Sequence, residues 1–212
     1  GNWVNRPGNS LRDIFLPWMP HTLASVEKRQ AALKTICKEQ PEVAWKLLES
    51  LLPNQHSTTS GTHQPSWRET IPKGWEKGVT NSEYWEQSRF CAELIVEQAG
   101  FDAVKLASLV ANYDHLQPPA ADTFRDKLIS DSCLMLSEQE RMPLWSALCK
   151  FIARHRRFPE AEWSLGDDSL LAMEEIANQL APKSPTLLNK RLFSEADAYL
   201  YNIDGDRHEE EG

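Results

Sequence analysis

Helix start signals recur along this chain at short intervals, and they restrict what it can fold into. Ser137 stands three residues before Glu140, the spacing of a capping box, in which a hydroxyl and a carboxylate satisfy free backbone N–H groups at a helix start. Thr80 and Glu83 repeat that spacing. Pro41 suits the first position of a helix, where its missing N–H costs nothing. All nine glycines fall between the helices that these signals define, so the sequence predicts a series of punctuated helices.

Apolar residues follow a helical period between these signals. The segment from Pro41, for example, places Leu47, Leu48 and Leu51 on one face. β-Branched residues are sparse and never alternate as they do in a strand. We expect helices over about 25–39, 41–52, 80–99, 102–111, 119–136, 137–157 and 167–180, after a short turn at 10–15. The predicted fold is all-α: irregular antiparallel helical hairpins, stacked as a bundle or short solenoid, with one long ordered loop.

The acidic charge of the chain lies at its C-terminal end. The formal net charge is −8, of which −6 belongs to residues 195–212 and −2 to the other 194 residues. We expect one α-helical domain over 1–194 and an acidic, frayed segment over 195–212. A nearly neutral body gives no general electrostatic attraction to nucleic acid.

The four cysteines, Cys37, Cys91, Cys133 and Cys149, each fall within an expected helix. No two of them form a Cys-x-x-Cys pair, so neither a zinc site nor a redox motif is expected. Free cysteines in a core fit the reducing cytoplasm. No apolar run approaches the roughly 20 residues that span a membrane, and the first residues lack a signal-peptide pattern. Since the chain does not begin with Met, we expect a fragment of a larger cytoplasmic protein.

A long irregular segment, 53–79, interrupts the helices and carries aromatic and basic side chains. Loops of this length are uncommon in compact domains unless they have a function. One hypothesis is that Trp67 and Trp75 pack the segment onto the helices, with Arg68 held by a carboxylate or by helix C-terminal carbonyls. The other is that a partner contacts the segment, through His63, Trp67, Arg68 and Trp75. No Cys or carboxylate shares the spacing of the loop histidines, so no metal site is expected.

A second cluster of basic residues ends the helix that begins at Ser137. Arg154, Arg156 and Arg157 lie there in the last turn, where cations complement the partial negative charge of a helix C-terminus. The alternative is an anion or nucleic-acid contact, in which Trp163 stacks on a base. A single basic turn on a nearly neutral body favours the first interpretation.

Sequence motifs for catalysis and for cofactor binding are absent. There is no Gly-x-Ser-x-Gly, no His-Glu-x-x-His, no P-loop and no dinucleotide-binding glycine pattern. Trp45, Trp85 and Trp145 lie on expected helices, where we expect core or helix-contact roles. We therefore predict no catalytic residue, cofactor, metal or small-molecule substrate. A third hypothesis is an unrecognised hydrolase that uses His56 or His63.

Four segments together resemble a known group of proteins: Leu-Pro-Trp-Met-Pro-His-Thr at 16–22, Pro-Glu-Val-Ala-Trp-Lys-Leu-Leu at 41–48, Thr-His-Gln-Pro-Ser-Trp-Arg at 62–68 and His-Arg-Arg-Phe-Pro-Glu-Ala-Glu-Trp at 155–163. They are similar to the helical region of very large bacterial multidomain proteins, some of which look like sirtuin-like or STAND-NTPase antiphage-defence proteins. The resemblance covers most of residues 10–194, and its motifs are structural. It implies a scaffold or sensor portion, with the enzymatic parts in other domains and no catalytic residue carried over.

The leading hypothesis is a non-enzymatic helical scaffold or sensor module in a larger bacterial protein. It mediates intramolecular or protein–protein contacts, so its expected partner is another domain of the same chain or a second protein, and not a membrane. The alternative is a nucleic-acid-contacting helical domain that uses the basic cluster at 154–157.

Overall fold

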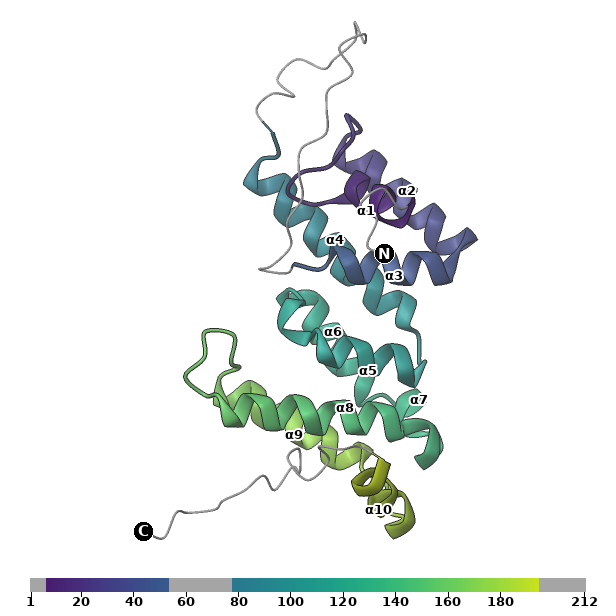
Figure 1. Cartoon of the computed structure of the whole chain (residues 1–212), viewed down its shortest axis with the longest axis vertical. Helices are drawn as coiled ribbons and strands as arrows, with labels where there is room; N and C mark the ends of the chain where they lie inside the picture. Colours follow the sequence, from purple (N-terminus) through teal and green to yellow (C-terminus); the bar gives the residue numbers. More distant parts are fainter. Residues whose placement is uncertain (1–6, 54–77, 195–212) are drawn as a thin grey trace, which may run out of the picture. The chain divides into compact units, whose positions relative to one another are not determined.

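Every regular element that the structure describes is a helix (Figure 1). The computed structural model describes residues 7–53 and 78–194, the side chains of 190–194 excepted. These ranges contain no strand, which confirms the all-α prediction for them, and no helix there is long and apolar enough to cross a membrane. The α-helices are α1 (Pro7–Phe15), α2 (Val26–Glu39), α3 (Pro41–Leu51), α4 (Asn81–Ala99), α5 (Ala103–Ala111), α6 (Pro118–Leu128), α7 (Asp131–Leu134), α8 (Glu138–Arg157), α9 (Asp167–Leu180) and α10 (Pro185–Ser194). A 3-10 turn, η2 (Tyr113–His115), follows α5.

The chain divides into two compact units. The first comprises Gly1–Gln98 and His115–Ala120, and the second comprises Ala99–Asp114 and Ala121–Gly212. The first unit contains α1 to α3 and nearly all of α4, whereas α5, α7 to α10 and most of α6 belong to the second.

In the first unit, α2 and α3 form the predicted helical hairpin. Ser25 caps α2, because its hydroxyl accepts a hydrogen bond from the Lys28 N–H at 3.5 Å. Only Gln40 separates α2 from α3, and the two helices pack on each other, while α1 packs on α3. Burial of Leu33 from α2 and of Leu48 from α3 provides the apolar core that holds the hairpin together.

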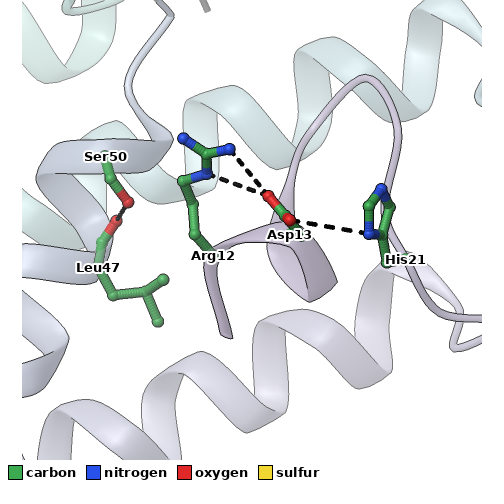
Figure 2. A network of polar contacts seen from close by, with 5 residues as sticks. All are labelled: Arg12, Asp13, His21, Leu47 and Ser50. Atoms are coloured by element: carbon green, nitrogen blue, oxygen red, sulfur yellow. Dashed lines mark hydrogen bonds and ion pairs between the residues drawn. The ribbon is translucent and has the colours of Figure 1, made fainter. Parts of the chain in front are cut away.

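The segment that follows α1 is tied back to this helix through Asp13. The His21 N–H donates to the Asp13 carbonyl at 2.8 Å, and Nδ1 of His21 lies 3.8 Å from Oδ2 of Asp13 (Figure 2). Nη2 of Arg12 donates to Oδ1 of the same carboxylate at 2.9 Å. These contacts fix the path of the chain from α1 toward the cap of α2.

In the second unit, α8 is the central helix. The predicted capping box forms at its start: the Glu140 N–H donates to Oγ of Ser137 at 3.3 Å, and the Ser137 N–H donates to Oε2 of Glu140 at 2.9 Å. The helix then continues for 20 residues, with Pro143 inside it. Because α5, α9 and α10 all contact α8, its apolar residues lie at the centre of this unit, with Leu144, Leu148 and Ile152 each 0% exposed.

Several element bounds differ from the sequence prediction. α1 begins at Pro7, earlier than expected, because proline at the first helical position already has the φ that a helix needs, and Gly8 therefore lies inside a helix. The predicted helix over 119–136 is broken at Ser130, so that α7 is a separate short helix. α10, which begins at Pro185, was not predicted.

The helix tryptophans differ in burial. Trp45 and Trp145 are buried, at 8% and 6% exposed, as predicted. Trp85 is 53% exposed, so of its two predicted roles the core role is wrong, and the helix-contact role stays a prediction. The buried face of α4 includes Gln87 and Ser88 instead, and the position of Trp85 on the helix consequently turns outward.

All four cysteines are buried as free thiols, as predicted. Burial raises the pKa of Cys91 to about 12. Burial also raises the pKa of Cys37 and of Cys133. Since the thiolate is the reactive form of cysteine, these side chains are inert core residues.

Candidate functional site

The predicted basic cluster occupies the last turn of α8, and the segment 158–166 folds back onto that turn. The hydroxyl of Ser164 donates to the His155 carbonyl at 3.3 Å. The Leu165 N–H donates to Nδ1 of the His155 imidazole at 3.0 Å. Both contacts come from the segment that links α8 to α9, so this loop is held at a defined place by one histidine.

His155 is a core residue, at 1% exposed, although it stands within the basic cluster at 154–157. Its ring lies 4.2 Å from the Phe151 ring and 5.2 Å from the Trp163 ring, centroid to centroid. Burial lowers the pKa of His155, Asp114 opposes this shift and Arg154 adds to it. An imidazole that accepts a hydrogen bond at Nδ1 is neutral and carries its proton on Nε2. That Nε2 is buried and has no hydrogen-bond partner among the described residues.

Arg154 and Trp163, two of the predicted contact residues, contact each other. The guanidinium carbon of Arg154 lies 4.1 Å from the centroid of the Trp163 ring, within the range of a cation–π interaction. Nη2 of Arg154 also lies 3.9 Å from Oδ2 of Asp114, whose side chain is only 12% exposed. One face of the Trp163 ring is therefore already covered, which leaves less of it for stacking on a base.

The other two arginines of the cluster also have partners within the chain. Arg156 forms an ion pair with Glu174 of α9, with Nη2 and Oε1 2.5 Å apart. The guanidinium carbon of Arg157 lies 5.7 Å from the centroid of the Phe158 ring. Phe158 is 50% exposed and meets Trp163 edge to face at 6.1 Å. The end of α8 thus presents arginines stacked with aromatic rings rather than a row of free cations.

Acidic side chains balance the positive charge of this cluster. Arg154 and Arg156 face carboxylates, as described above, and the linking segment adds Glu160 and Glu162. Four acids thus stand against three arginines, so the region has no excess of positive charge with which to attract a phosphate backbone. The arrangement fits the first interpretation of the cluster, in which the arginines complement the C-terminus of α8 and pack locally.

The other predicted contact residues fall in a part of the chain outside the described ranges. His63, Trp67, Arg68 and Trp75 belong to residues 54–77, as does His56 of the hydrolase hypothesis. Both hypotheses for the long loop therefore stay predictions.

Catalysis and metal binding each need several reactive or ligating side chains close together. No cluster of three or more His, Cys, Asp or Glu side chains able to hold a metal ion occurs there. Asp13 and His21 pair as an acid and an imidazole, but no nucleophile within 7–53 or 78–194 is seen to join them. Ser50, which Figure 2 shows on a neighbouring helix, donates its hydroxyl to the Leu47 carbonyl at 2.7 Å and does not bond to His21.

A buried polar group in the first unit was missed by the sequence analysis. Arg29 is 3% exposed, and Gln87 and Ser88 are each 0% exposed. Burial lowers the pKa of Arg29, while Glu83, Cys91 and Glu27 act in the opposite direction. A sequence signal did exist, because Glu83, Gln87 and Cys91 follow one another at four-residue spacing and so share one face of α4.

Compared with family models, with curated proteins and with solved structures, the chain matches none.

Proposed function

We propose that this chain is a non-enzymatic helical module that mediates contact with protein, as a scaffold or sensor part of a larger bacterial protein. The observation that carries the proposal is an exposed surface of apolar and cationic side chains at the end of α8. We call it the α8-end surface and define it by the exposed Arg157 and Phe158, the half-buried Trp163, and the exposed Leu171 of the first turns of α9. Its partner is another domain of the same chain or a second protein.

The composition of the α8-end surface suits a protein partner. Phe158 and Leu171 are 50% and 56% exposed, although both are large apolar side chains. Leu171 precedes Glu174 by three residues and so lies on the face of α9 that pairs with Arg156. Aromatic residues and arginine are the side chains most enriched at the anchor points of protein interfaces. A partner segment that offers an apolar side chain to Phe158 and a carboxylate to Arg157 would match this surface.

Two further points support the proposal. The resemblance to the helical region of large bacterial defence proteins implies a scaffold or sensor role, with catalysis in other domains. The buried free thiols fit a reducing compartment, in agreement with a cytoplasmic parent protein. The nucleic-acid alternative receives no comparable support, because two of the three arginines it needs, Arg154 and Arg156, face carboxylates.

Site-specific photo-crosslinking in cells that express the parent protein tests the proposal. A photoreactive phenylalanine analogue at Phe158 or at Leu171 should give a protein–protein crosslink, within the chain or to a second protein. The same analogue at Met135, which is 84% exposed elsewhere in the second unit, is the matched control and should not.

The variant Arg157→Glu, made in the protein that carries the photoreactive analogue, tests whether the crosslink depends on the α8-end surface. It reverses the charge next to Phe158 and should remove the crosslink while leaving the helical spectrum unchanged. Equal crosslinking at all three positions would contradict the proposal, and adducts destroyed by nuclease would favour the nucleic-acid alternative.

A further inference from the structure

We propose that the segment 158–166 is a clasp that is closed on neutral His155 and opens when this imidazole is protonated in mildly acidic solution. The contacts involved lie within the chain, so the inference does not depend on which partner the α8-end surface binds. It assigns a regulatory device to the link between α8 and α9.

The closed clasp requires an acceptor at Nδ1 of His155. The Leu165 N–H donates to this atom at 3.0 Å, and the ring around it is 1% exposed. Protonation converts Nδ1 into a donor that faces another donor, so the hydrogen bond is lost, and a ring that is 1% exposed can gain solvent partners in its place only if the clasp opens. The chemistry of this single atom therefore decides whether the loop can stay in place.

The neighbours of His155 reinforce this dependence on its charge. Phe151 and Trp163 pack against the ring, and both give an apolar surrounding that disfavours an imidazolium. Arg154, which stacks on Trp163, adds a positive charge on the same turn of α8. A protonated ring would thus repel Arg154, which contacts the same tryptophan.

Charged side chains stand on η2, on α8, on the clasp and on α9, and two of them act on the ring. Asp114 of η2 favours the protonated form, and Arg154 of α8 disfavours it. The clasp itself carries Glu160 and Glu162, and Glu174 of α9 is engaged by Arg156. Burial has the largest effect, so the net direction is a pKa of His155 below its ordinary value of 6.5.

This direction fixes the pH range of the opening. The open state binds a proton near pH 6.5, whereas the closed state binds one only at lower pH. The closed clasp is therefore fully favoured above pH 6.5 and loses stability as the pH falls toward the lowered pKa. Between the pKa of the closed state and that of the open state, the equilibrium constant for opening should rise roughly tenfold for each unit by which the pH falls.

NMR of the ¹⁵N-labelled full chain tests the clasp directly, because it follows the Leu165 amide and the ring nitrogens of His155 in the unmodified protein. As the pH of the solution is lowered from about 7.5 to below the lowered pKa of His155, the ring should change from the neutral form protonated at Nε2 to the imidazolium. Protection of the Leu165 amide against hydrogen exchange should fall over the same range, while α8 remains helical. A Leu165 amide that stays protected after His155 has become protonated would overturn the proposal, and so would a ring that is already protonated at the upper pH.

The variant His155→Asn is the matched control. The Oδ1 of asparagine branches from Cγ as Nδ1 does in histidine, so it can accept from the Leu165 N–H, but it does not titrate. In a folded variant, protection of the Leu165 amide should no longer depend on pH in this range. The same pH dependence in His155→Asn as in the wild type would show that another group opens the segment. If this variant does not fold, the titration of the wild-type protein still decides.

Discussion

Arg29 is an unusual residue in the core of the first unit, since it is a cation at 3% exposed. Its Nη1 donates to the Leu16 carbonyl at 3.4 Å, and its Nε has no hydrogen-bond partner among the described residues. No carboxylate within the described ranges lies at ion-pair distance from it, although Glu83 and Glu27 act on it from further away. The desolvation of the guanidinium therefore offsets much of what its contacts contribute.

The variant Arg29→Met tests this balance. Methionine fills a similar space without a charge, so the loss of the bond to Leu16 should be compensated by the removal of the desolvation cost. We expect the free energy of unfolding in urea to change by less than about 1 kcal/mol. On the same helix, Leu33→Ala removes a purely apolar side chain at 1% exposed and should cost about 2–5 kcal/mol. An equal loss in the two variants would show that the guanidinium stabilises the unit.

The buried thiols give a second prediction at this scale. With the pKa of Cys91 at about 12 and those of Cys37 and Cys133 raised by burial, hardly any thiolate is present in the native protein at neutral pH. A thiol reagent should therefore label native protein slowly and label all four cysteines rapidly in denaturant. Rapid labelling of two or more thiols without denaturant would contradict their place in the core, and counting labelled thiols by mass spectrometry makes the distinction.

At the scale of the element, a cap or a proline predicted the start of several helices correctly. The starts of α2, α3 and α8 follow directly from Ser25, Pro41 and Ser137. The break before α7 was missed because the apolar period continues across Ser130. α10 was missed although Pro185 stands at its first position, a signal that the sequence analysis did not use.

The candidate site was predictable only in part, for a physical reason. Local sequence placed the arginines in the last turn of a helix, but the carboxylates that they face, Asp114 and Glu174, are distant in sequence and could not be inferred from it. The burial of His155 did have a signal, because Leu148, Phe151, Ile152 and His155 continue one apolar face of α8. Because His155 stands among arginines, its place on this apolar face was not recognised.

The capping box of α8 gives a prediction at the element scale. Ser137→Ala removes the acceptor of the Glu140 N–H and one donor to its carboxylate, and should cost about 1 kcal/mol in the free energy of unfolding. Ser137→Asp, which keeps an acceptor at the cap, is the control and should be close to the wild type. A loss as large in Ser137→Asp as in Ser137→Ala would show that the cap hydrogen bond is not the cause.

The same capping box predicts that the stability difference between wild type and Ser137→Ala depends on pH. Hydrogen bonds from the Ser137 side chain and backbone lower the pKa of Glu140 below 4.5. A carboxylate with a lowered pKa contributes stability above the unfolded value, and this contribution is lost as the pH falls through the folded value. Thermal unfolding below pH 4.5 should therefore separate wild type from Ser137→Ala less than it does at neutral pH. A constant difference between the two proteins over this range would contradict the role of the Glu140 carboxylate.

At the scale of the whole molecule, charge decides between the two proposed kinds of partner. The formal net charge is −8, and the one basic cluster is balanced by its neighbours. A protein that binds nucleic acid without sequence preference does so through phosphate contacts, typically with a Kd of about 10⁻⁴ to 10⁻⁶ M at physiological salt. We expect weaker binding than this for a random duplex or single strand, with little dependence on salt.

The measurement is fluorescence anisotropy of a labelled random oligonucleotide, titrated with the full chain at several salt concentrations. The double variant Arg156→Ala, Arg157→Ala is the control, and it should be indistinguishable from the wild type because neither arginine contacts phosphate in this interpretation. Binding that weakens steeply with salt, and is lost in the double variant, would instead establish the nucleic-acid alternative. Each phosphate contact contributes roughly one unit to the slope of log K against log salt, so the slope would also tell how many of the arginines take part.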